Sequence, residues 1–251
     1  MIGKPIRILI IVMGSIAFIL AACVIGWNLV RLYGLQSSLQ DVYFMEYVNG
    51  TTIYKYDVDR RKTVVEAVLE GGSYSDCKIN RAENYIIGEF YSYEDGTRFL
   101  LRYNLSDGTT EEITGKEAEM IEERISEAEN RLRSSLPEGV KKIVYNYPIS
   151  WSTDGNTAAF SDTKQKNLYL YHADTGTWDC VLTAGWNRTF GSNVGLDASG
   201  RYLFYKDNFN YFFDTADIRI MIYDTKTKMR AKIYGRKYTQ ISYEFVQDLD
   251  F

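Results

Sequence analysis

Side chains that could perform acid–base, nucleophilic or metal chemistry are few in this chain and widely spaced. His172 is the single histidine, and it stands at a strand-to-turn corner where similar segments carry Asp or Asn, which favours a structural role. The sequence contains no Gly-x-Ser-x-Gly elbow, phosphate-binding loop, dinucleotide fingerprint or His-Glu-x-x-His motif. We therefore expect no catalytic residue, no cofactor and no metal site.

Paired carboxylates are the remaining route to catalysis, because two of them suffice for glycoside hydrolysis. Asp57, Asp154, Asp197 and Asp224 all fall in polar turns, where a carboxylate usually caps local backbone N–H groups. A hydrolase or lyase acting on glycans or peptides stays an alternative, and it requires at least two carboxylates to converge in one pocket.

Two cysteines, Cys77 and Cys180, follow the N-terminal segment, and in an oxidising compartment they could form a disulfide. Two free thiols are the other interpretation, since spacing alone does not establish the required geometry. Zinc is not expected, because no cysteine pair has ligand spacing and only one histidine is present.

The aromatic segment Asn208-Phe209-Asn210-Tyr211-Phe212 is a candidate ligand-binding site. Aromatic rings beside amides suit sugars or peptides, although such residues also fill sheet cores. Nucleic acid is not an expected partner, since the net charge is −4 and the pI is about 5.3.

Four segments repeat a strand, a Tyr-Asp-like corner, a polar turn and a second strand, a pattern typical of hairpins. They are 53–63, 100–110, 168–178 and 220–230. A further strand–turn–strand element, seen at 151–160 and 196–205 and more loosely at 79–88, precedes three of them. With 21 tyrosines and 12 phenylalanines, this patterning predicts an all-β fold.

These residues resemble the W-S-x-D-G-x-x-I-A-F … I-Y-x-x-D-x-x-T-G repeat of TolB-like and other WD40-like β-propellers, best over 151–177. The resemblance implies four-stranded antiparallel blades around an axis and ligand binding at the ends of a central channel. About four blades are expected, with blade one near 41–69 and the others near 73–114, 143–184 and 190–235. Strand 238–246 is expected to complete blade one, and an open stack of sheets is the alternative.

Between the second and third blades, the sequence predicts an inserted amphipathic helix over 116–136. One apolar stripe runs along it, through Ile125 and Leu132 among others. The helix either caps the β domain or docks a partner, and the candidate partner-binding residues are Glu119, Glu122, Glu123 and Arg131.

The stretch 8–30 carries no charge and is long enough to span a bilayer. Lys4 and Arg7 precede it, which predicts a cytoplasmic N-terminus and an exported C-terminal domain. An uncleaved single-pass signal anchor is favoured. The sequence Leu20-Ala21-Ala22-Cys23 also resembles a lipobox, in which Cys23 would be lipidated.

The expected organisation is a plasma-membrane anchor over 1–33, a linker over 34–40 and an extracytoplasmic propeller-like domain over 41–251. We interpret the chain as a binding module for a protein or envelope component. A hydrolase and a structural subunit of an envelope assembly are the alternatives.

Overall fold

Strand pairing in the computed structural model divides the β structure into four sheets, antiparallel except for one short parallel pair, and these are the blades of a four-bladed propeller. All of them belong to the unit Gln40–Phe251. The structure describes residues 39–48, 50–144, 148–210, 216–239 and 242–248, with isolated positions from Met13 to Cys23.

Blade 1 joins the two ends of the domain. Its strands, from the centre outward, are β16 (Ser242–Phe245), β1 (Val42–Tyr47), β2 (Thr51–Asp57) and β3 (Lys62–Leu69). The pairing Phe44–Phe245 sets the register between β1 and β16. This confirms that a C-terminal strand completes the first blade, and ring closure of this kind leaves one fewer exposed sheet edge.

Blades 2 to 4 follow in chain order. Blade 2 contains β4 (Gly72–Asn80), β5 (Tyr85–Ser92), β6 (Arg98–Asn104) and β7 (Thr110–Ile113), and β17 (Gln247–Asp248) pairs with β4 in parallel. Blade 3 contains β8 (Ser150–Trp151), β9 (Thr157–Ser161), β10 (Asn167–His172) and β11 (Thr177–Thr183). Blade 4 contains β12 (Arg188–Leu196), β13 (Tyr202–Asn210), β14 (Ala216–Asp224) and β15 (Met229–Thr239).

The predicted final strand was too long. Residues 238 and 239 end β15 of blade 4, and only 242–245 add to blade 1. One continuous run of β-favouring residues therefore serves two blades, because the chain must leave the outer strand of one and enter the centre of the other.

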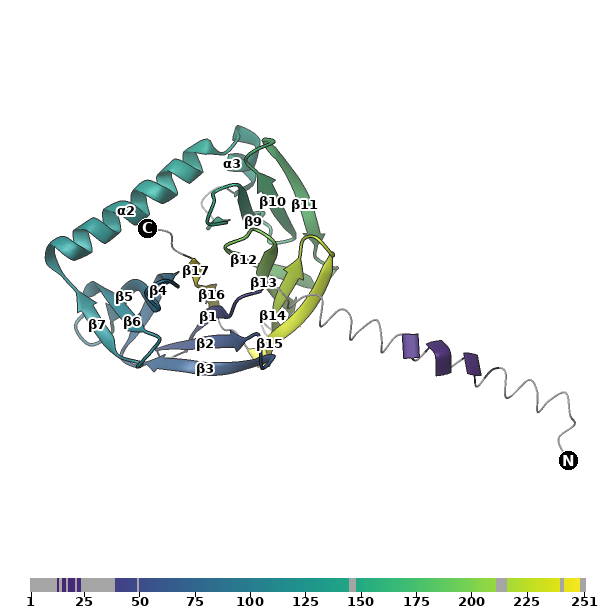
Figure 1. Cartoon of the computed structure of the whole chain (residues 1–251), viewed down its shortest axis with the longest axis horizontal. Helices are drawn as coiled ribbons and strands as arrows, with labels where there is room; N and C mark the ends of the chain where they lie inside the picture. Colours follow the sequence, from purple (N-terminus) through teal and green to yellow (C-terminus); the bar gives the residue numbers. More distant parts are fainter. Residues whose placement is uncertain are drawn as a thin grey trace, which may run out of the picture. The chain divides into compact units, whose positions relative to one another are not determined.

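The inserted segment forms two helices, α2 (Gly115–Ser135) and α3 (Glu138–Val144). In Figure 1, α2 leaves the end of β7 and runs to α3 beside blade 3. The second helix was not predicted, and residues 143 and 144 are helical instead of starting blade 3. Pro137 was read only as a stop, yet proline also favours the first position of a helix, and its carbonyl accepts from the Lys141 N–H (3.0 Å).

Apolar cores lie between neighbouring blades. Tyr43 and Ile53 of blade 1 pack with Tyr74 and Ile86 of blade 2, and a similar cluster joins blades 3 and 4. Blades 4 and 1 meet through stacked and tilted rings that include Phe44, Tyr54 and Tyr234. Blades 2 and 3 are instead bridged by α2, which makes their junction the unusual one.

Within the described residues, no helix combines the length and the apolar character that a membrane crossing requires. Most of the anchor predicted over 8–30 lies outside the described residues.

Candidate functional site

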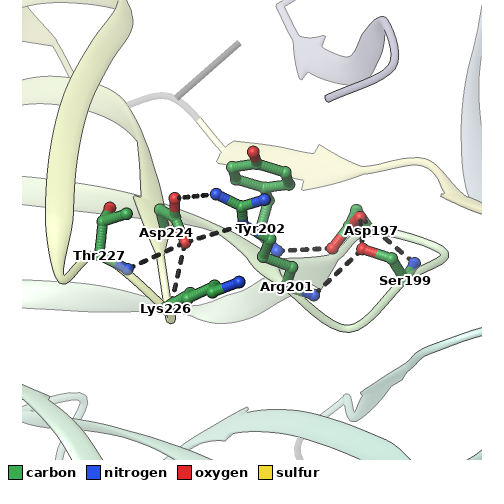
Figure 2. A network of polar contacts seen from close by, with 7 residues as sticks. All are labelled: Asp197, Ser199, Arg201, Tyr202, Asp224, Lys226 and Thr227. Atoms are coloured by element: carbon green, nitrogen blue, oxygen red, sulfur yellow. Dashed lines mark hydrogen bonds and ion pairs between the residues drawn. The ribbon is translucent and has the colours of Figure 1, made fainter. Parts of the chain in front are cut away.

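The repeat aspartates hold turns, as the sequence predicted. Asp224 is fully buried and accepts hydrogen bonds from Arg201 Nε (3.1 Å) and Nη2 (2.8 Å) and from the Lys226 N–H (2.9 Å). Burial alone would raise the pKa of Asp224, but these donors outweigh it and the pKa is lowered. Figure 2 shows this carboxylate enclosed by its donors, with Asp197 bracing the preceding turn through Tyr202 N–H (2.5 Å).

The same role recurs in the other repeats. Asp57 accepts the Arg60 N–H (2.8 Å), and Asp154 accepts the Ser152 hydroxyl (2.6 Å) and the Asn156 N–H (3.0 Å). Gly200 shows why the turn motif is specific: its φ is +73°, and a Cβ there would lie 3.0 Å from Thr157. These four aspartates are therefore turn residues in the described structure.

The junction between blades 2 and 3 encloses a cavity of about 720 Å³, which is within the usual range for ligand sites. Its walls come from β4, from the C-terminal half of α2, from residues 148–155 at the start of blade 3, from Asn193 of β12 in blade 4, and from the C-terminal strands. Elements far apart in the chain thus meet around one space.

The helix α2 is packed along one half and unpacked along the other. Ile121 is buried against Ile87 and Leu100 of blade 2. Further along the same stripe, Ala128 and Leu132 line the cavity. The predicted apolar stripe therefore exists, and half of it faces a space instead of a sheet.

One ion pair fixes the helix above the cavity. Lys78 on β4, which is 8% exposed, donates to Glu129 Oε1 of α2 (3.0 Å) and to Gln247 Oε1 of β17 (3.0 Å). This ammonium therefore connects blade 2, the helix and the C-terminal strand.

Carboxylates do line this cavity, which meets the structural condition set by the hydrolase alternative. Glu244 accepts the Tyr47 hydroxyl (2.5 Å) and the Asp76 N–H (2.9 Å), so both of its oxygens are occupied. Asp248 is paired with Arg81. Burial raises the pKa of both carboxyls, and the lowering effects of Tyr47 and Arg81 offset this only in part.

Charged and polar side chains form part of the cavity wall. Asn193 Oδ1 is buried without a hydrogen bond to any described residue, and the exposed side chains of Asp76 and Arg131 also line the cavity. Beside them lie the apolar surfaces of Trp151 and Leu132. One negative group, one positive group, one acceptor and an aromatic ring suit recognition of a ligand with mixed polarity.

The predicted site residues fall in separate places. Asn208, Phe209 and Asn210 end β13 in blade 4, whereas Tyr211 and Phe212 lie outside the described residues. Glu119, Glu122 and Glu123 are exposed on α2, whereas Arg131 lines the cavity. The role of the three glutamates in partner binding stays a prediction.

The cysteines lie in different blades as free thiols, Cys77 buried in β4 and Cys180 exposed on β11. Cys77 faces inward, so that a Cβ on Gly88 would meet its Sγ at 2.5 Å. The described residues contain no group of three His, Cys, Asp or Glu side chains able to hold a metal ion.

Sequence reasoning missed most of the cavity. Glu244 and Asp248 were read only as part of a closing strand or a solvated loop, and Asp76, Asn193 and Trp151 had no assigned site. Lys78 offered one signal, as a charge between Cys77 and Ile79 in β4, but its partners are more than fifty residues away.

No protein-family model matches the sequence, and no curated protein matches it. Solved structures do match at low identity. A chain of the nidogen/laminin complex is 8% identical over 78% of this chain and 62% of that chain (TM-score 0.26). TolB from Acinetobacter baumannii is 12% identical over 77% and 40% (TM-score 0.27). A putative TolB from Agrobacterium tumefaciens is 10% identical over 78% and 66% (TM-score 0.30).

This chain therefore spans less than two thirds of each of these three chains. At such values no activity, ligand or partner is transferred from them to this protein. The four-bladed architecture rests on the strand pairing itself.

Proposed function

We propose that this chain is a membrane-anchored, extracytoplasmic binding module whose propeller recognises a protein or envelope component through the cavity beneath α2. The observation that carries the proposal is a cavity of about 720 Å³ whose wall presents a buried Asn193 Oδ1, without a hydrogen-bond partner among the described residues, and the exposed charges of Asp76 and Arg131 beside Trp151. Fixed polar groups around an apolar surface are the usual composition of a ligand site.

Binding is favoured over catalysis because the carboxylates of the cavity, apart from that of Asp76, already contact other groups of the protein. Glu129 is held by Lys78, Glu244 by Tyr47 and Asp248 by Arg81. A general acid or base must exchange its proton with a substrate at hydrogen-bond distance, and oxygens committed to the protein are poorly placed for this.

The test uses anilinonaphthalenesulfonate, an anionic aromatic dye that matches the Arg131 charge and the Trp151 surface. Because the dye also enters detergent micelles, the signal is the fluorescence above a protein-free detergent blank. We expect the full-length chain to give such a signal, and Ala128→Phe, which fills the cavity, to abolish it. The matched control is Met120→Phe on the solvent face of the same helix, where the side chain is 59% exposed. If the Ala128→Phe variant still binds the dye, the cavity is not the binding site.

A hydrolase or lyase is the second candidate, favoured by one contact: the Asp76 N–H donates to Glu244, so two acidic residues are neighbours at the cavity. Release of reducing ends from soluble glycans, lost in both Asp76→Asn and Glu244→Gln, would establish this function in place of simple binding.

Export of the domain is tested through its cysteines. Cys180 is exposed and Cys77 is buried, so a membrane-impermeant maleimide should label the wild-type chain on intact cells and fail to label Cys180→Ser. Labelling of Cys180 only after lysis would place the domain in the cytoplasm and contradict the proposal. If processing is blocked by globomycin and the mature chain carries added mass at Cys23, the protein has a lipid anchor and not an uncleaved signal anchor.

A further inference from the structure

The most exposed large apolar side chain of the described residues is not part of the cavity lining. Trp186 is 93% exposed, in the turn that joins β11 of blade 3 to β12 of blade 4. An indole contributes a large apolar surface when it is covered, and here no described residue covers it. Folding of the domain therefore does not explain this tryptophan.

The turn that carries Trp186 is firmly braced. The Lys166 ammonium donates to the carbonyls of Trp186 (3.4 Å) and Arg188. Arg188 in turn forms an ion pair with Asp207 (2.6 Å) and lies 5.4 Å from the centre of the Phe209 ring. A ring presented on a rigid support loses little conformational freedom when it binds, which is characteristic of recognition sites.

A row of neutral polar side chains follows the Trp186 turn, on the adjoining ends of β12 and β13. Thr189 and Asn208 are directly opposed across β12 and β13, and alternation places Asn210 on the same face as Asn208. The Asn210 amide donates to the Thr189 hydroxyl (3.3 Å), and the Asn210 N–H donates to the carbonyl of Asn187 (2.9 Å).

Two amides of this region have features that suit binding of a ligand. Asn208 Oδ1 is buried without a partner among the described residues, and the side-chain amide of Asn187 is only half-buried. Amides both donate and accept, so they match hydroxyl groups, which do the same.

We propose that this end of blade 4 is a carbohydrate-binding site, in which Trp186 stacks against the apolar face of a pyranose ring while Asn187, Asn208 and Asn210 bind its hydroxyls. The uncharged amide row distinguishes a sugar from a bilayer or an apolar protein pocket, because neither of those would supply hydroxyl partners. The site is independent of the cavity under α2, so each can fail without the other.

The test is ligand-observed saturation-transfer NMR on the full-length chain, in a detergent without a sugar head group. The probes are chitotetraose, cellotetraose and maltotetraose. We expect at least one probe to receive saturation on the ring protons of its apolar face. Trp186→Ala should weaken its affinity by about tenfold or more, as loss of a central aromatic anchor does, and Trp186→Tyr should restore part of it.

Trp178→Ala is the matched control, since Trp178 is 38% exposed and packs against Gly139 of α3. The Trp178→Ala variant should bind the sugar probe with the same affinity as the wild type. Asn210→Ala should weaken binding of the probe several-fold. The proposal is overturned if none of the three probes binds, or if binding is unchanged in Trp186→Ala.

Discussion

Two junctions of the ring are closed by different means. Between blades 4 and 1, Glu46 is buried, and it accepts from Arg236 Nη1 (2.8 Å), Tyr234 (3.2 Å) and Tyr243 (3.3 Å). Between blades 2 and 3, the helix α2 bridges a cavity of about 720 Å³. The first junction is filled with rings and satisfied charge, whereas the second leaves space and a buried acceptor, Asn193 Oδ1, without a partner among the described residues.

The difference indicates that the junction between blades 4 and 1 stabilises the fold, whereas the junction between blades 2 and 3 has room for a ligand. A network of buried polar groups that are all hydrogen-bonded favours a single conformation of the chain. The Glu46 network is of this kind, and it connects the C-terminal strands to β1. At the other junction, an inserted helix replaces direct blade packing. Recognition is then expected where packing stops, which is why we place the ligand there.

The largest expected effect lies at the packed junction. Arg236→Leu removes the cation that neutralises Glu46, whose side chain is 3% exposed. Because a buried charge without its partner is costly, we expect a loss of about 2–3 kcal/mol in the free energy of unfolding, measured by urea denaturation.

Arg60→Leu is the control for this substitution, since Arg60 forms an exposed pair with Asp57 and its side chain is 80% exposed. It should cost no more than about 0.5 kcal/mol. Equal losses in the two variants would contradict the importance of the Glu46 network.

The next prediction compares the two halves of α2. Ile121 is buried in the blade 2 core, so Ile121→Ala should lower the unfolding free energy by about 2–4 kcal/mol. Leu132 lines the cavity, so Leu132→Ala removes fewer contacts and should cost less than about 1 kcal/mol. A larger loss for Leu132→Ala would show that the second half of the helix is packed.

A smaller effect is expected from pH. The pKa of Glu244 is raised by burial, so the folded state binds this proton more tightly than the unfolded state does. Its contribution is complete below the ordinary carboxyl pKa of about 4.3 and is lost as the pH rises through the raised value.

Glu244→Gln should therefore flatten the fall of the urea midpoint between pH 4 and pH 8, relative to the wild type. Exposed Glu119→Gln serves as its control. A wild-type profile retained in Glu244→Gln would show that this carboxyl does not titrate as described.

Much of the ring was predictable because its information is local. The Asp-Gly and Ser-Gly turns, such as Asp154-Gly155, encode hairpins within about ten residues, and the leftover C-terminal strand required a partner. The cavity was not predictable, since Lys78, Glu129 and Gln247 become neighbours only when the ring closes. The exposure of Trp186 could not be predicted from the sequence either, because an aromatic residue between two strands is usually predicted to be buried in the core.

The measurement that most directly tests the central claim is the unfolding free energy of Ala128→Phe. If a ligand-sized cavity lies beneath α2, the added ring enters empty space, and the value should stay within about 1 kcal/mol of that for Met120→Phe, after allowance for the higher helix propensity of Ala relative to Met. If α2 is instead packed there, overpacking should cost about 1–3 kcal/mol more than the control, and that result would contradict the account.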